Sequence, residues 1–100
     1  MHPYTINATI QIVPIIANPT KHPYVWVDEA IAIIQQSGIR YHVGPFATEL
    51  EGTYSEVINV INAVNDYLCK QACPEWISNI QLQIRSQEAI TGAEKTEAYR

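Results

Sequence analysis

IRYHVGPFATELEG, residues 39–52, predicts a β-hairpin between two helical patterns. Apolar and polar residues alternate over 39–43, as they do on a half-buried strand. Gly44-Pro45 then turns the chain into a second strand at about 46–51. The elements before and after this hairpin determine how its sheet is completed.

An amphipathic helix is predicted on each side of the hairpin. Before it, over about 23–37, apolar residues recur with helical spacing until Gly38 ends the pattern. After it, Thr53 and Glu56 have the spacing of a capping box, and an apolar stripe continues until Pro74. The stripe consists of Val57, Val60, Ile61, Val64 and Leu68.

The two ends of the chain each add a strand, since residues 4–13 and 77–85 alternate between apolar and polar. The order β-α-β-β-α-β predicts an α+β, ferredoxin-like sandwich, in which two helices cover one face of a four-stranded antiparallel sheet. One hundred residues suit one domain, 1–100. Thr91 and Glu94 have capping-box spacing, so residues 91–100 are either a short terminal helix or a tail.

The sheet face away from the helices is expected to carry neutral polar side chains instead of the usual Lys and Glu. Its expected members are Thr5, Asn7, Thr9, Gln11, Asn79, Gln81 and Gln83, with Arg40 and His42. Amides and hydroxyls can be buried against partners at a lower desolvation cost than charges. We therefore expect a homo-oligomer, dimer or tetramer, that buries this face; an exposed polar face in a monomer is the alternative.

Composition excludes several classes of partner. The formal net charge is -4, and the six Lys and Arg residues are scattered, which argues against nucleic acid. No apolar run approaches the roughly 18 residues of a membrane helix, and the N-terminus has no cationic region. We expect a cytoplasmic protein without a membrane partner.

No pattern of catalytic or metal-binding residues is recognisable. His2, His22 and His42 are dispersed, and no nucleophile, phosphate loop or set of zinc ligands accompanies them. Cys69 and Cys73 are four apart on a predicted helix, where Cβ atoms are about 5–6 Å apart, too far for a disulfide. We expect free thiols, no metal, no cofactor and no enzymatic activity.

The chain resembles the thiamine-binding protein family of small YkoF-like domains. The resemblance runs from about Thr9 to Arg85 and rests on Val13-Pro14, on SGIRYHVGP at 37–45, and on Thr48 followed by Glu51-Gly52. It implies the ferredoxin-like fold, homo-oligomeric assembly and the binding of thiamine or its hydroxymethylpyrimidine half, with no catalytic residue. A regulatory or structural homo-oligomer without a metabolite ligand is the alternative.

Thiamine combines an aminopyrimidine with a cationic thiazolium, so its pocket needs an apolar or aromatic slot, a carboxylate and a neutral hydrogen-bonding group. The hairpin offers all three. The candidate ligand-binding residues are Thr48, Glu51, Glu49, Tyr41 and Phe46.

Each candidate also has a structural interpretation. The Thr48 hydroxyl can bond to backbone, and Glu51 can stabilise the positive end of the following helix. Glu49 can pair with Arg40 across the hairpin, and Tyr41 can belong to the core. These alternatives stay open at the level of sequence.

Overall fold

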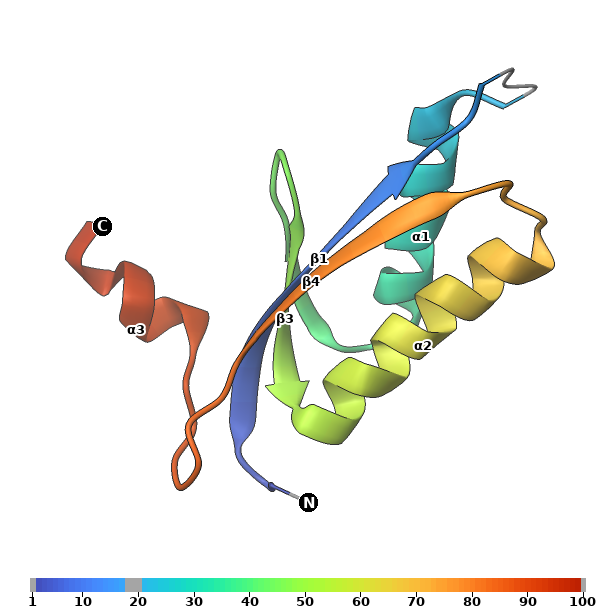
Figure 1. The fold of residues 1–100 in the computed structure, drawn as a ribbon. Helices are drawn as coiled ribbons and strands as arrows, with labels where there is room; N and C mark the ends of the chain where they lie inside the picture. Colours follow the sequence, from blue (N-terminus) through green and yellow to red (C-terminus); the bar gives the residue numbers. More distant parts are fainter. Residues whose placement is uncertain (1, 18–20, 100) are drawn as a thin grey trace.

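The computed structural model describes residues 2–17 and 21–99 and consists of one antiparallel sheet with two long helices packed on one face (Figure 1). The elements in chain order are β1 (Thr5–Pro14), α1 (Pro23–Gln36), β2 (Arg40–Val43), β3 (Thr48–Thr53), α2 (Tyr54–Lys70), β4 (Trp76–Gln83), α3 (Gly92–Thr96) and the short 3₁₀ helix η1 (Glu97–Tyr99). The predicted ferredoxin-like fold is confirmed.

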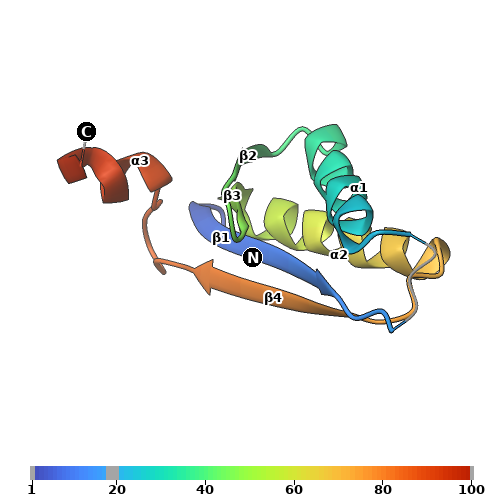
Figure 2. The ribbon, with the colours of Figure 1, turned by 90° about the horizontal axis from the view of Figure 1, so that it is seen from above.

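The strand order is β2-β3-β1-β4, which places the first strand of the chain beside both β3 and β4. Ile10 of β1 lies opposite Thr48 on one side and Ile80 on the other. These residues point to the face covered by α1 and α2, the helix face (Figure 2). The opposite face, the open face, carries the side chains of Thr9, Gln11, Asn79, Gln81, Gln83, Glu49, Glu51, Arg40, His42 and Asn7.

Helix α2 begins with the predicted capping box. The Thr53 hydroxyl accepts a hydrogen bond from the Glu56 amide at 3.2 Å, and the Glu56 carboxylate accepts one from the Thr53 amide at 2.8 Å. The helix ends at Lys70, earlier than the expected stop at Pro74. Ala72 has a φ of 57°, a left-handed conformation that ends the helix before the proline does.

The hydrophobic core lies between the helix face and the two long helices. All five residues of the predicted α2 stripe are buried, and they pack with Ile6, Ala8, Ile10, Leu50, Trp26, Ala30 and Ile34. The helical spacing of the stripe therefore predicted the orientation of α2 correctly.

The helices bury the apolar side chains of β4 less completely than the alternation of apolar and polar residues predicts. Ile80 and Leu82 lie on the helix face, yet both stay more than one third exposed. The reason is topological: β4 is an edge strand, and its neighbour on one side only is β1.

The C-terminal residues form α3 with the predicted capping box between Thr91 and Glu94. Ile90, just before it, is fully buried, which the sequence did not indicate. Its amide donates to the carbonyl of Thr5 at 3.0 Å, and its carbonyl accepts from the Asn7 side chain at 2.9 Å. Residues 90–92, the C-terminal strap, thus tether α3 to the sheet, while α3 itself extends away from the sheet and from the two long helices (Figure 1).

Candidate functional site

A pocket of about 90 Å³ lies between α1, the end of β1 and the tip of the β2–β3 hairpin. Its lining is mostly apolar: Ile10, Ile12, Val27, Ala30, Ile31, Ile34, Pro45, Phe46 and Ala47, with Gln11, Gly44 and Thr48. The hairpin tip closes through a hydrogen bond of 3.0 Å from the Gly44 amide to the Ala47 carbonyl. A Cβ at position 44 would lie 2.9 Å from that carbonyl, so the tip requires glycine there.

Thr48 is the first residue of β3 and contributes a polar group to this pocket. It is only 5% exposed and lies on the helix face, opposite Ile10 of β1 and Val43 of β2. A mostly apolar pocket is therefore lined at one point by a buried residue that carries a hydroxyl.

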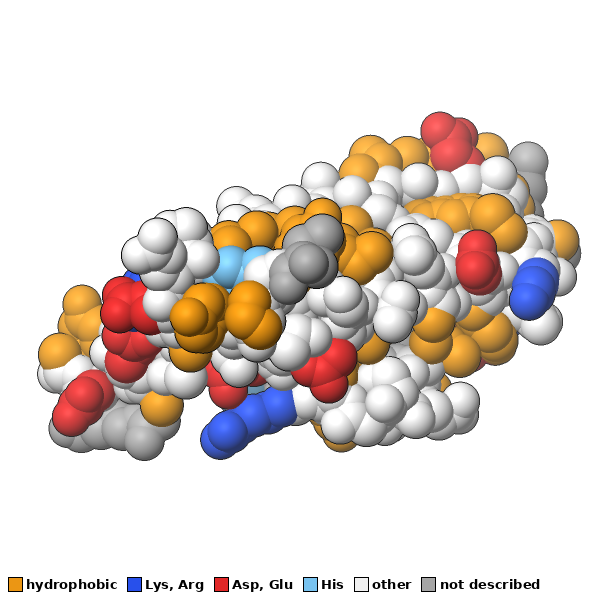
Figure 3. Space-filling model, turned by 90° about the horizontal axis from the view of Figure 1, so that it is seen from below, with side chains coloured by type: hydrophobic (Ala, Val, Ile, Leu, Met, Phe, Trp, Pro, Cys, Tyr) orange, Lys and Arg blue, Asp and Glu red, His pale blue; other side chains and the backbone are white. Residues whose placement is uncertain are grey.

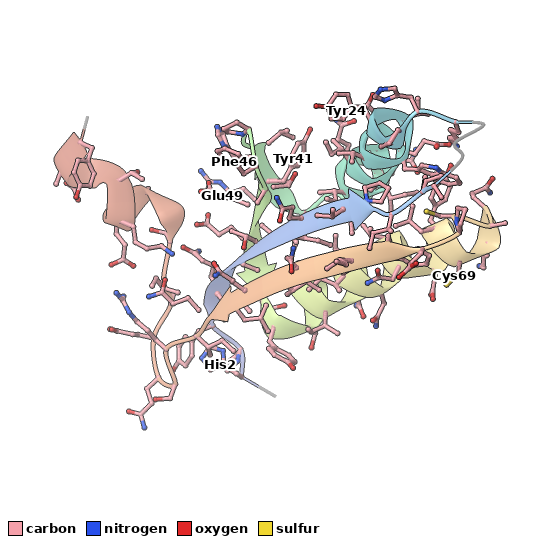
Figure 4. All side chains as sticks on the ribbon, turned by 45° about the horizontal axis from the view of Figure 1, so that its top comes forward. His2, Tyr24, Tyr41, Phe46, Glu49 and Cys69 are labelled. Carbon is pink, nitrogen blue, oxygen red and sulfur yellow. The ribbon has the colours of Figure 1, made fainter. Side chains whose placement is uncertain are left out.

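Phe46 lies at the rim of the pocket and is 83% exposed. The strand was expected to begin at residue 46, but β3 begins at Thr48, and Phe46 belongs to the turn at the tip. The direction of the Phe46 side chain is therefore not set by the alternation of faces along a strand. Tyr41 of β2 lies opposite Leu50 near the same end of the sheet but does not line the pocket. In Figure 4, Phe46, Tyr41 and Glu49 gather around the hairpin.

Glu49 and Glu51 lie on the open face, away from Thr48. Glu49 is exposed, and its carboxylate is 3.8 Å from His42 Nδ1. The expected pair of Glu49 with Arg40 is wrong, because the register places Arg40 opposite Glu51. Arg40 Nε is 3.5 Å from the Glu51 carboxylate.

Glu51 is engaged with the C-terminal strap. Its Oε1 accepts hydrogen bonds from the Gly92 amide at 2.6 Å and from Asn7 Nδ2 at 3.3 Å, and its side chain is only 17% exposed. The carboxylate thereby stabilises the first amide of α3, whereas the sequence suggested the N-terminus of α2. Within one chain, the five candidates therefore form two groups on opposite faces of the sheet.

A second, wider groove of about 240 Å³ lies between the end of α1 and the exposed side of α2. It is lined by Ser37, Gly38, Ile39, Glu56, Asn59, Val60 and Ala63. Its carboxylate, Glu56, is already bonded to the Thr53 amide, and this hydrogen bond lowers the pKa of Glu56. The groove has fewer apolar walls than the Thr48 pocket.

At the far end of the helices, Glu29 of α1 accepts hydrogen bonds from Lys21 and, at 2.8 Å, from Tyr67 of α2. The bond from Lys21, and then that from Tyr67, lowers the pKa of Glu29, while the bond to Glu29 raises the pKa of Tyr67. Burial raises the pKa of Cys73, and both cysteines are free thiols as predicted. This cluster joins the two helices and lies apart from the pocket.

The described part of the chain contains no group of three or more His, Cys, Asp or Glu residues placed to hold a metal ion. Within residues 2–17 and 21–99, no helix is long and apolar enough to span a membrane. On the face shown in Figure 3, Lys and Arg side chains appear separately between hydrophobic and uncharged areas. A basic surface for nucleic acid is not present on that face.

Comparison with known proteins identifies a family and a relative of similar length. Residues 8–100 match the family described as thiamine-binding protein. A UPF0045 protein of Clostridium perfringens is 25% identical over 96 residues, which cover 96% of this chain and 98% of that protein.

Solved structures agree with this match. A domain of unknown function from Bacillus cereus shares 32% of its residues with a TM-score of 0.87, covering 97% of this chain and 91% of the other. A Thermotoga maritima protein, provisionally assigned to thiamine biosynthesis or salvage, is 27% identical with a TM-score of 0.83, covering 96% and 99%.

Proposed function

The chain belongs to the thiamine-binding protein family, and we propose that it binds thiamine or its hydroxymethylpyrimidine moiety and performs no chemistry of its own. The observation that carries this proposal is the mostly apolar pocket whose lining includes the buried Thr48. An aromatic ring fits between apolar walls, and a buried hydroxyl can donate to a ring nitrogen or accept from an amino group.

The size of the pocket favours the pyrimidine half as the inserted group. About 90 Å³ is well below the roughly 300 Å³ at which pockets for drug-sized ligands begin. The pyrimidine ring therefore occupies the space beside Thr48, and the rest of the ligand lies outside, near the rim. Phe46, exposed at that rim, offers an aromatic face to a cationic thiazolium.

Thr48 and Phe46 are thus the primary proposed contacts, with Tyr41 next to them on the hairpin. We retain Glu51, before Glu49, as the proposed partner of the ligand's amino group or positive charge. Because both carboxylates lie on the open face, this second role requires ligand bound on that face. Variants at Thr48 and at Glu51 therefore test two separate contacts.

A ligand screen tests the function directly. Thermal shift and isothermal titration should be run with thiamine, its phosphates and hydroxymethylpyrimidine. A ligand at 100 times its dissociation constant adds about 2.7 kcal/mol to the free energy of unfolding, which is readily measured. If none of these compounds binds, the chain is better explained as a regulatory or structural oligomer without a metabolite ligand.

We further propose that the protein is a homodimer or homotetramer in which the open face is covered. Away from the strap, this face carries the exposed amides of Gln81 and Asn79, and Asn79 donates a hydrogen bond of 3.1 Å to the half-buried Gln11. Neutral amides of this kind can exchange hydrogen bonds with the same face of a second subunit.

A further inference from the structure

Tyr24 and Phe46 are two of the three most exposed large apolar side chains in the described part of the chain. Their exposed fractions are 73% and 83%, and that of Tyr99, in η1, is 87%. A solitary exposed aromatic residue needs no explanation. These two, however, belong to the two elements that form the Thr48 pocket: Tyr24 to the first turn of α1 and Phe46 to the tip of the hairpin. In Figure 4, both lie at the same end of the molecule.

Helical spacing places Tyr24 on the side of α1 that forms the pocket wall. Val27 and Ile31 line the pocket from α1, and they follow Tyr24 by about one and two helical turns. The side of α1 toward α2 is a different one, because Glu29 accepts a hydrogen bond from Tyr67 of α2 there. The ring of Tyr24 therefore lies beside the rim of the pocket.

Asp28 brings a carboxylate to the same rim. It is exposed, and it lies four residues after Tyr24 and three before Ile31, so it shares their side of the helix. Of the two charged residues of α1, Asp28 and Glu29, only Asp28 lies on this side. The lining of the pocket itself contains no charged side chain.

The positive side chains next to α1 and on the hairpin are bound elsewhere. Lys21, just before α1, pairs with Glu29 and lies 3.9 Å from the centroid of the Trp26 ring. Arg40 of β2 pairs with Glu51 on the open face. The rim of the pocket thus combines aromatic rings and a carboxylate with uncharged walls, an arrangement that attracts a cation and repels an anion.

We infer that Tyr24, Asp28 and Phe46 form the subsite for the positive charge of the ligand, so that the site takes cationic, unphosphorylated thiamine in preference to its phosphate esters. This inference rests on the proposed function. With the pyrimidine in the pocket, the thiazolium lies at the rim, where the aromatic faces and the carboxylate attract it. A phosphate on the hydroxyethyl tail would add negative charge near Asp28, and the pocket lining has no Lys or Arg to receive it.

Asp28 meets a geometric requirement that Glu51 does not meet. Helix α1 covers the face of the sheet from which Thr48 projects, so one ligand can contact Thr48 and Asp28 together (Figure 2). Glu51 projects from the open face, and its carboxylate accepts the hydrogen bond from the Gly92 amide. The carboxylate that serves a ligand in the Thr48 pocket is therefore the one on α1.

Isothermal titration with thiamine and with neutral hydroxymethylpyrimidine tests the subsite. Asp28→Asn and Tyr24→Leu should each raise the Kd of thiamine about 2- to 5-fold at low salt, with little change for hydroxymethylpyrimidine. Tyr24→Phe keeps the ring and should recover the affinity that Tyr24→Leu loses. The matched controls are Asp66→Asn on α2 and Tyr99→Leu on η1, which change exposed residues away from the pocket and should leave both affinities unaltered.

A charge reversal tests the selection against phosphate. The wild type should bind thiamine about 2- to 5-fold more tightly than thiamine monophosphate, and Asp28→Lys should remove or reverse this preference. Circular dichroism confirms that each variant is folded. Equal affinity of the wild type for thiamine and its monophosphate overturns the inference.

The outcomes separate the subsite from the proposed function. A wild type that binds thiamine, with the same affinity in Asp28→Asn and Tyr24→Leu, overturns the subsite and leaves the proposed function standing. An equal loss of affinity for thiamine and hydroxymethylpyrimidine in these variants also overturns it, because the neutral compound has no charge for the subsite to recognise. A wild type that binds neither compound refutes the proposed function and the subsite together.

Discussion

Thr48 and Glu51 are three residues apart on β3 and project from opposite faces of the sheet. Thr48 lies opposite Ile10 and contributes to the pocket under α1, whereas Glu51 lies opposite Asn7 and binds the amide of Gly92. The motif that joins them in the sequence therefore supplies two different sites: a hydroxyl for the pocket and a carboxylate for the C-terminal strap. Each site leads to its own prediction.

Thr48→Val should weaken ligand binding by about 0.5–1.5 kcal/mol, because it keeps the shape of the side chain but removes one hydrogen bond. The matched control is Thr9→Val, the same change on β1 with its side chain on the open face. Isothermal titration with thiamine and hydroxymethylpyrimidine measures both variants. Equal affinity for Thr48→Val and wild type would contradict a ligand contact at Thr48.

Glu51→Gln should loosen the C-terminal strap, because it weakens the charge-assisted hydrogen bond with Gly92 and the ion pair with Arg40. Hydrogen exchange of the amides at residues 90–92 should become faster, with little change in α2. Glu49→Gln is the control, since Glu49 is exposed and makes no contact with the strap. The role of Glu51 in the strap is refuted if both variants protect these amides equally.

The same Glu51→Gln variant tests whether the Glu51 carboxylate contacts the positive charge of the ligand. If Glu51 also contacts the ligand, cationic thiamine should lose more affinity than neutral hydroxymethylpyrimidine, and added salt should narrow the difference. Affinities must be compared at matched stability, since the strap is altered as well. A uniform loss for both ligands would assign the effect to the strap alone.

Replacing Gln81 and Gln83 together with lysine should dissociate an oligomer that buries the open face. The substitution places four like charges, two from each subunit, at positions that now contribute only neutral amides to the contact. Solution mass provides the measurement. A wild type that is already monomeric at micromolar concentration, or a variant of unchanged mass, would exclude an interface on this face.

Val64→Ala should lower the free energy of unfolding by about 1–3 kcal/mol, through lost burial and a residual cavity. Val64 is fully buried in the stripe of α2, so contacts with water cannot replace the packing contacts that the shorter side chain loses. Val43→Ala, at a position 45% exposed, should cost much less. Urea denaturation compares the two, and similar values would be inconsistent with the observed packing of α2.

Ionisation of Glu29 should make the free energy of unfolding depend on pH in the acidic range. The hydrogen bonds from Lys21 and Tyr67 lower its pKa in the folded chain below the unfolded value of about 4.3. The ionised carboxylate therefore contributes stability above the unfolded pKa, and this contribution is lost as the pH falls through the lower folded pKa. The stability gap between wild type and Glu29→Gln should thus be wider at about pH 7 than at about pH 3.

Urea unfolding at both pH values measures this gap. Tyr67→Phe removes one of the two donors and should reproduce part of the pH dependence. A gap of equal size at both pH values would show that the carboxylate's charge contributes nothing to the junction of α1 and α2.

The order and type of the four strands and two long helices could be predicted from the sequence, because the signals for them are local. Alternation along strands, the apolar stripe of α2 and the capping box of Thr53 with Glu56 each depend on residues within a few positions of one another. The sequence also placed Gln11, Asn79 and Gln81 on one face of the sheet correctly, since alternation on a strand follows directly from the geometry of the backbone.

Contacts between residues far apart in the chain depend on how the whole domain packs, and local patterns do not predict them. Asn7 contacts Ile90, 83 residues away, and Glu51 contacts Gly92, 41 residues away, so no local pattern could reveal the strap. The register of β2 with β3 places Arg40 opposite Glu51 instead of Glu49. The order of the strands places β4 at an edge of the sheet. A register shift of one residue changes every partner and every face, and that choice depends on the packing of the whole domain.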